Sequence, residues 1–212
     1  MIRLHSLQIG KIAPLGPDQV PSGYVKRPTA NRVTVAASGL GGDAIADLSV
    51  HGGPEKAIYG YSLAHYNSWK EEHPEHADRL ALGAFGENLT IDGLTEADIC
   101  LGDVHRIGPV LLQVCQPRQP CFKFALFFGD KRMPKAMVRS GRAGWYYRVL
   151  EGGTIGAGDT IELAARPQPG FRFSRLVEIV NRGGATREEL VALAGMDEVA
   201  SQVRQAAQAS LQ

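Results

Sequence analysis

Short runs of alternating apolar and polar residues, interrupted by glycine and proline, fill the first 165 positions and limit the folds open to this chain. The 212 residues include 25 glycines and 12 prolines. Between these breaks the alternation is clear in RLHSLQI, NRVTVAA, ENLTIDGL, GDVHRIGPVLLQV and GDTIELAARP. Such alternation is typical of half-buried strands joined by turns, and two Gly-Asp pairs read as hairpin corners. The sequence therefore predicts a mainly β fold of the α+β class.

One helix is expected among the strands. Ser62 is a plausible N-cap, and Leu63, Tyr66 and Trp69 fall on one helical face before the His-Pro pair at 73–74 ends the pattern. This helix should pack on the sheet.

The pattern becomes helical towards the C-terminus. We expect a β domain over residues 1–165, a proline-rich linker over 166–171 and a small three-helix domain over 172–212, with helices at 174–181, 186–194 and roughly 197–211. In TREELVALAG, Thr186 is an N-cap, Glu189 stands at the capping-box position and Gly195 is a stop signal. A unit this small has little core, so it should dock on the β domain or on a partner chain, which leaves a homodimer open.

Composition excludes several classes of partner. The chain is 44% apolar and 21% charged, with a formal net charge of +1, so nothing points to nucleic acid or to an anionic membrane surface. The N-terminal residues lack the apolar core of a signal peptide, and no segment approaches a membrane-spanning length. We expect a cytoplasmic protein whose three cysteines are free thiols.

Those thiols have different surroundings. Cys121 lies in QVCQPRQPCFK, where two prolines stiffen the chain and Arg118 and Lys123 supply positive charge. A cation within about 4 to 6 Å favours the thiolate, the form that binds metals and attacks electrophiles. Cys100 and Cys115 stand in apolar runs and are expected to be packed. The residues alone leave Cys121 balanced between a reactive and a packed thiol.

Two other segments are candidates for a site. The turn formed by His51, Gly52 and Gly53 exposes backbone N–H groups that suit an anion, and Lys56 adds charge nearby. His51 could bind a ligand or simply cap its own turn.

In GAFGENLT, Asn88 could read the edge of a heterocycle, and the alternative is a turn that only bonds to itself. The chain has no Cys-x-x-Cys, His-Glu-x-x-His or Gly-x-Ser-x-Gly motif, so a structural zinc site is not expected.

Taken together, several motifs resemble the MOSC domain family, the molybdenum cofactor sulfurase C-terminal domain, and most closely its YiiM-like branch with a C-terminal three-helix domain. The motifs are DLSVHGGPEKAIYGYSLAHYNSW, GAFGENLT, LGDVHRIG, CQPRQPCFK and GWYYRVLEGGTIGAGDTIEL. The resemblance implies a MOSC-type β-barrel with a few helices. It also implies a molybdenum cofactor, Mo-molybdopterin, with Cys121 as the metal ligand and catalytic residue, and it gives no reason to expect pyridoxal phosphate.

The resemblance assigns further cofactor contacts. Lys26 is expected at the cofactor phosphate, with Lys56 and the turn at His51, Gly52 and Gly53 as other anion contacts. Arg118 is expected beside the metal. Glu87 and Asn88 are expected at the pterin or the substrate.

The implied activity is the reduction of N-hydroxylated compounds, such as 6-N-hydroxylaminopurine, to amines. Three cysteines are too few for an iron–sulfur cluster, and no flavin fingerprint is present, so a separate flavoprotein-type reductase must supply electrons. Three alternatives remain open: a molybdenum cofactor carrier or sulfur-transfer protein without turnover, a metal-free cysteine enzyme using Cys121 with His51, and a purely structural barrel.

Overall fold

The computed structural model describes residues 1–47 and 52–212. Its largest element is an eight-stranded sheet, with the strand order β13 (Ile161–Ala165), β9 (Val104–Ile107), β10 (Val110–Pro117), β11 (Trp145–Glu151), β7 (Ile58–Ser62), β8 (Leu89–Asp92), β1 (Arg3–Gly10) and β4 (Lys26–Pro28). Within the described chain, all strand pairs of this sheet are antiparallel except β7 with β8. The mixed α+β class predicted from the sequence is confirmed.

The sheet curls until its ends approach each other. An isolated bridge joins Arg3 of β1 to Thr160, just before β13. Backbone bonds from Leu4 to Asp159 and from Ile161 to Ile2 reinforce this contact. A continuous ladder does not form there, so a few bonds and not a strand pair complete the barrel-like shape.

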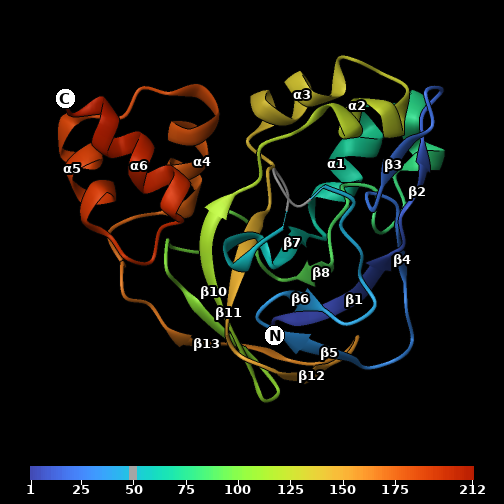
Figure 1. The fold of residues 1–212 in the computed structure, drawn as a ribbon, viewed down its shortest axis with the longest axis horizontal. Helices are drawn as coiled ribbons and strands as arrows, with labels where there is room; N and C mark the ends of the chain where they lie inside the picture. Colours follow the sequence, from blue (N-terminus) through green and yellow to red (C-terminus); the bar gives the residue numbers. More distant parts are fainter. Residues whose placement is uncertain (48–51) are drawn as a thin grey trace.

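Smaller strands and helices surround this sheet. A three-stranded sheet contains β12 (Gly153–Ile155), β5 (Val33–Ala36) and β6 (Gly39–Leu40), and a hairpin contains β2 (Ala13–Leu15) and β3 (Val20–Ser22). Three helices gather at one end of the sheet (Figure 1): α1 (His65–Glu72), α2 (Phe122–Phe128) and α3 (Met133–Ser140). Two short 3₁₀ helices are η1 (Pro54–Lys56) and η2 (Pro74–Arg79). None of the helices in the described ranges has the length and apolar character that crossing a bilayer requires.

The expected start of the first helix is wrong. Ser62 is the last residue of β7, where its pairing with Ile91 of β8 keeps the backbone extended. The helix begins three residues later, at His65, with Ala64 as its N-cap. Tyr66 and Trp69 do form its buried face, as the spacing predicts.

Three helices form a tail beside β10 (Figure 1): α4 (Phe173–Arg182), α5 (Arg187–Gly195) and α6 (Ser201–Ser210). The capping box at the start of α5 is confirmed, because Thr186 and Glu189 each bond the other's backbone N–H. The last helix starts later than the sequence predicts. Its preceding residue, Ala200, instead donates its N–H to the carbonyl of Cys115 in β10.

The tail docks on the sheet of its own chain. Apolar side chains of the tail, including Phe173, Leu176 and Val203, belong to the same core cluster as Leu112 and Val114 of β10. A second, aromatic cluster lies under α1 and α2. The candidate site lies where the sheet, α2 and the tail meet.

Candidate functional site

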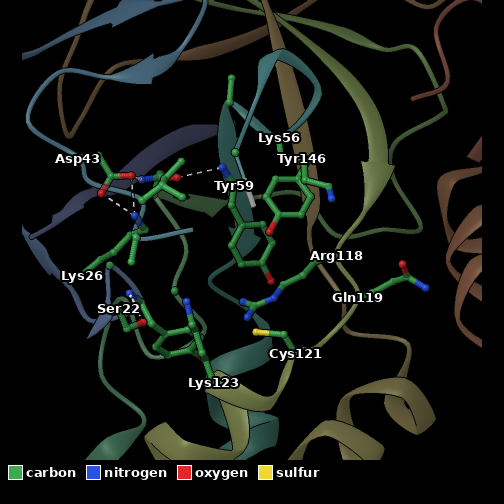
Figure 2. A pocket seen from close by; sticks show the side chains of 18 of the residues that line it. Ser22, Lys26, Asp43, Lys56, Tyr59, Arg118, Gln119, Cys121, Lys123 and Tyr146 are labelled. Atoms are coloured by element: carbon green, nitrogen blue, oxygen red, sulfur yellow. Dashed lines mark hydrogen bonds and ion pairs between the residues drawn. The ribbon is translucent and has the colours of Figure 1, made fainter. Parts of the chain in front are cut away.

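A cavity of about 300 Å³ opens between the sheet, the start of α2 and the beginning of α6. Its walls come from segments that lie far apart in the sequence (Figure 2). The lining residues include Tyr24, Lys26, Asp43, Gly52, Lys56, Tyr59, Asn88, Gln116, Arg118, Gln119, Cys121, Lys123, Tyr146 and Gln202. Six of the residues expected from the sequence are therefore brought together: Lys26, Gly52, Lys56, Asn88, Arg118 and Cys121.

Cys121 stands at the N-terminal boundary of α2 and is half-buried. The strand β10 ends at Pro117, and the following loop carries Pro120, so the backbone leading to the thiol has two fixed φ angles. Phe124 donates its backbone N–H to the Cys121 carbonyl. The thiol is thus held at the cavity wall by a stiff loop and the first turn of a helix.

Arg118 is almost completely buried beside this thiol, with 5% of its surface exposed. Its guanidinium lies 5.0 Å from the ring centroid of Tyr59, 5.5 Å from that of Tyr24 and 5.7 Å from that of Phe124. It also donates to the carbonyl of Phe85. A planar guanidinium suits such stacking and remains charged when buried.

The charge of Arg118 interacts with Cys121. Burial alone would lower the pKa of Arg118, but electrostatic interactions with neighbouring groups, Cys121 among them, raise it. Figure 2 shows the guanidinium next to the Cys121 sulfur at the cavity edge. A permanent cation beside a thiol favours its thiolate form.

Lys26 lies on the opposite wall in an ion pair. Its Nζ is 2.5 Å from both carboxylate oxygens of Asp43, and both side chains are more than 90% buried. Burial lowers the pKa of Lys26, and Asp43 partly offsets that effect. Asp43 also accepts the N–H of Gly10 at 2.8 Å. The assignment of Lys26 to a phosphate stays a prediction, and any such anion would share this cation with Asp43.

Asn88 connects the ion pair to the sheet. Its Nδ2 donates to Asp43 at 2.9 Å, and its Oδ1 accepts the N–H of Tyr59 at 3.1 Å. Asn88 therefore lines the cavity while its amide orients two other wall residues.

Glu87 does not line the cavity and is fully buried. Its carboxylate accepts hydrogen bonds from Gly83 N at 2.8 Å, Thr90 Oγ1 at 3.0 Å and the Tyr66 hydroxyl. Burial raises the pKa of Glu87. In this position Glu87 holds the loop before β8 together, and its expected contact with pterin or substrate stays a prediction.

The glycine turn is only partly described, and His51 lies outside the described residues. Gly52 lines the cavity, whereas Gly53 is the N-cap of η1 with φ of +83° and does not line it. Lys56 contributes to the wall, with its Nζ 3.5 Å from Gln202 Oε1 of the tail.

Sequence reasoning missed several wall residues. Asp43 and Gln202 reach the cavity through long-range packing and docking of the tail, and no local motif marks them. Tyr146 lies in the motif GWYYRV, whose aromatic residues are more often part of a core than of a pocket. Tyr24 carried a weaker signal, because it stands two positions before Lys26 in SGYVK.

The other two cysteines are packed, as the sequence predicts. Cys100 and Cys115 are both fully buried. Burial raises the pKa of the Cys115 thiol to about 12, and its Sγ lies 3.1 Å from the carbonyl of Glu55. Cys121 is therefore the cysteine that a cavity ligand can reach.

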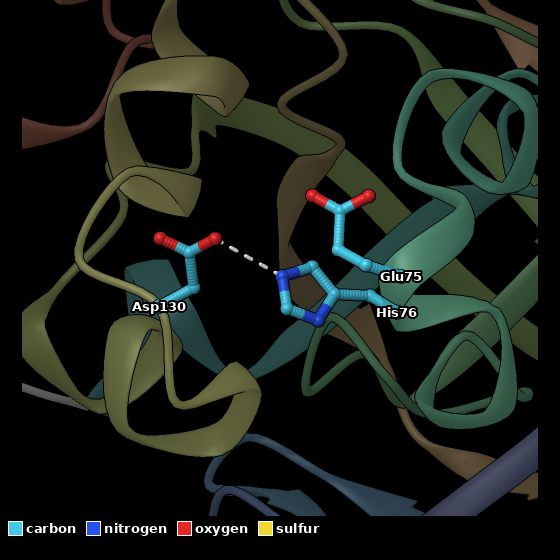
Figure 3. A group of neighbouring side chains, drawn as sticks. All are labelled: Glu75, His76 and Asp130. Carbon is cyan, nitrogen blue, oxygen red and sulfur yellow. Dashed lines mark hydrogen bonds and ion pairs between the residues drawn. The ribbon is translucent and has the colours of Figure 1, made fainter.

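A second group of polar side chains has the spacing of metal ligands: Glu75, His76 and Asp130 (Figure 3). His76 Nε2 lies 3.1 Å from Asp130 Oδ2. Arg132 already pairs with both carboxylates, at 2.7 Å from Asp130 and 3.4 Å from Glu75. An arginine in contact with both acids takes the place of a metal cation, so this cluster is an ion-pair network.

Comparison with known proteins identifies the family. The model of the MOSC domain matches residues 47–162, more than half of the chain. This segment includes Cys121 and most of the cavity wall.

Curated relatives agree with this match. YflK of Bacillus subtilis is 41% identical over 181 residues, covering 84% of this chain and 78% of that protein. YiiM of Escherichia coli is 39% identical over 150 residues, covering 71% of this chain and 67% of that protein. A protein named Reductase from Gibberella moniliformis is 41% identical over 163 residues, which are 76% of this chain but only 29% of that longer protein.

Solved structures extend the similarity to the tail. The crystal structure of YiiM from Geobacillus stearothermophilus superposes with a TM-score of 0.84 at 30% identity, covering 100% of both chains. That of YiiM from Escherichia coli superposes with a TM-score of 0.79 at 29% identity, covering 95% of this chain and 92% of that one. The chain belongs to the MOSC domain family, as a YiiM-like member.

Proposed function

We propose that this protein binds a molybdenum cofactor through Cys121 and reduces N-hydroxylated compounds to amines with electrons from a separate reductase. The observation that carries the proposal is the placement of one reachable cysteine beside a buried arginine in a cavity of about 300 Å³. The similarity to a protein named Reductase supports redox chemistry in general.

The residues of the cavity fit such a group. A metal already held by dithiolene sulfurs needs one more soft ligand, and a thiolate supplies it. Lys56 and Lys123 line the same cavity and carry positive charge suited to a phosphate. The rings of Tyr59 and Tyr146, whose centroids are 5.1 Å apart, offer an aromatic surface to a flat heterocycle.

The reaction balances with two electrons and two protons: the N–O bond of R–NHOH breaks, and R–NH₂ and water form. When bound, the cofactor would supply a metal that passes electron pairs to the N–O bond. The chain would hold the metal through Cys121, place the charge of Arg118 beside it and position the substrate.

A cofactor measurement tests the first half of the proposal. The chain is expressed in a host that makes molybdenum cofactor and purified without oxygen, and molybdenum and released pterin are measured per chain. We expect both in the wild type and in Cys115→Ser, and a joint loss of both in Cys121→Ser. Absence of both from the wild type contradicts the cofactor assignment.

A turnover measurement tests the second half. With a flavoprotein reductase as donor, the loaded wild type should convert 6-N-hydroxylaminopurine to the amine, and Cys121→Ser should not. A protein that carries the cofactor but turns over no N-hydroxylated compound would instead be a cofactor carrier or a sulfur-transfer protein.

A further inference from the structure

A second cavity, of about 420 Å³, lies within the helical tail. Its walls are mostly apolar and come from α4, α6 and the middle of α5, including Ile179, Val180, Leu190, Leu193, Val203, Ala206 and Ala207. Gly183 and Gly184, at φ of +76° and +78°, form part of its wall at the turn between α4 and α5. We refer to this cavity as the tail groove.

The tail groove adjoins the cavity that contains Cys121. Three glutamines line both: Gln116 at the end of β10, Gln119 in the loop before Cys121, and Gln202 in the first turn of α6. Gln119 extends from that loop towards the tail in Figure 2, and its Nε2 lies 3.4 Å from the carbonyl of Val180 in α4. The two spaces therefore meet at a border of amide side chains.

The chemistry of this arrangement suits a planar heteroaromatic molecule. Gln116 and Gln119 donate through Nε2 to the carbonyls of Glu55 and Val180, and Gln202 accepts from Lys56 through Oε1. The opposite ends of these amides, two acceptors and one donor, match the mixed edge of a purine or a similar ring. Beyond the amides, aliphatic side chains from two helices can cover the ring faces. A small substrate such as hydroxylamine has no ring that would use the apolar contacts of α4 and α6.

The size of the Cys121 cavity also favours a binding site for the substrate ring outside that cavity. The Cys121 cavity measures about 300 Å³ and would be taken up by the cofactor under the proposed function. The ring of a substrate therefore needs room outside this space, next to Cys121. The tail groove begins at Gln119, two positions before that residue.

We propose that the tail groove is the binding site for the ring of N-hydroxylated heteroaromatic substrates, whose N–OH group reaches the Cys121 cavity past the three glutamines. This inference rests on the proposed function and adds to it the place where the ring of the substrate binds. It also gives the helical tail a part in selecting the substrate.

The test uses a variant that fills the groove. Ala206 is exposed, lines the groove and does not line the Cys121 cavity, so Ala206→Trp places an indole in the proposed ring site. Gln205→Trp is the matched control, because Gln205 is an exposed neighbour on α6 that lines neither cavity. Cofactor content and thermal unfolding are measured for both variants.

The first readout is the KM for 6-N-hydroxylaminopurine divided by the KM for hydroxylamine, determined on the cofactor-loaded protein. In Ala206→Trp this ratio should rise about tenfold, which corresponds to about 1.4 kcal/mol of lost ring binding. In Gln205→Trp it should equal the wild-type ratio. An unchanged ratio in Ala206→Trp, or an equal rise in both variants, overturns the inference.

The second readout needs no turnover. Adenine, the reduced product, is added to each protein, and saturation-transfer NMR detects its contact with the chain. The signal should be present in the wild type and Gln205→Trp and absent in Ala206→Trp. Equal signals in all three proteins contradict binding of the ring in the tail groove. If the wild type reduces no N-hydroxylated compound, the proposed function fails, and adenine binding still decides whether the groove accepts a ring.

Discussion

Ser201 donates both its backbone N–H and its hydroxyl to one carboxylate oxygen of Glu55, at 2.9 and 2.6 Å. The other oxygen accepts from Arg148 at 2.7 Å. Glu55 belongs to η1, next to wall residue Lys56, whereas Ser201 begins the last helix of the tail, 146 positions later. One carboxylate therefore fastens the tail to the segment that lines the cavity.

Replacing Glu55 with glutamine should weaken this connection. Hydrogen bonds to a charged group contribute about 1.5 to 3 kcal/mol, so we expect Glu55→Gln to lower the free energy of unfolding by about that amount in urea titrations. Glu178→Gln is the control, because its exposed pair with Arg175 should change stability by no more than about 0.5 kcal/mol. Equal effects of the two substitutions would contradict the assigned role of Glu55.

The same contact has a pH dependence of known sign. Burial alone would raise the pKa of Glu55, but the bonds from Ser201 and Arg148 outweigh it and lower the pKa. An unfolded glutamate titrates near pH 4.3, about where this stabilisation begins to decline. It is complete above that pH and is lost as the pH falls through the folded pKa. The Glu55→Gln variant should lack this part of the acid dependence.

The three thiols should differ in reactivity. Cys100 and Cys115 are fully buried, and Cys121 is half-buried at a cavity wall. In the native protein without cofactor we expect iodoacetamide to modify one thiol per chain, mapped to Cys121 by mass spectrometry. Denatured protein should be modified at all three positions. Modification of Cys115 in the native state would contradict the buried position of that thiol.

The Lys26–Asp43 pair should be costly to break from one side. Asp43→Asn leaves a buried ammonium without its counter-charge, and such changes cost about 3 to 5 kcal/mol. Lys26→Met combined with Asp43→Asn should recover part of this loss in a double-mutant cycle. As a comparison, Arg32→Gln breaks a pair in which the Arg32 side chain is 54% exposed, and should cost no more than about 1 kcal/mol. If the losses of unfolding free energy caused by Lys26→Met and Asp43→Asn are additive, the two side chains do not interact.

His105 should make the fold sensitive to mild acid. Burial lowers its pKa to about 4, while an unfolded histidine titrates near pH 6.5. The unfolded chain therefore binds more protons between these values, and stability should fall by about 2 to 4 kcal/mol as the pH drops from 6.5 to 4. His105→Gln should remove this pH-dependent part of the free energy of unfolding, which urea titrations at several pH values would measure. An identical pH profile in wild type and His105→Gln would show that His105 does not contribute.

Local signals allowed correct prediction of parts of this fold. The capping box of Thr186 and Glu189 fixes the start of α5 because both partners lie within one turn. Alternation located the strand β5, since its residues are alternately buried and exposed. The prediction of Ser62 as an N-cap was wrong because its capping preference is weaker than the pairing of β7 with β8. That pairing joins distant segments of the chain.

The sequence allowed prediction of site residues only where a local motif contains residues that also line the cavity. Cys121 and Arg118 share one stiff loop, so the sequence showed both. Asp43 reaches Lys26 through long-range packing, and Gln202 arrives with the tail. No spacing rule connects such positions before the chain is folded.

The bridge between Arg3 and Thr160 also bears on how the protein is made. The residues that meet β1 at the closure of the sheet are translated more than 150 positions after it. Until then the backbone groups of β1 that face residue 160 lack their native partner. Nascent chains must therefore stay soluble with an incomplete sheet, a state in which strand edges invite wrong pairing. Slow translation or truncation before residue 160 should accordingly favour aggregation over folding.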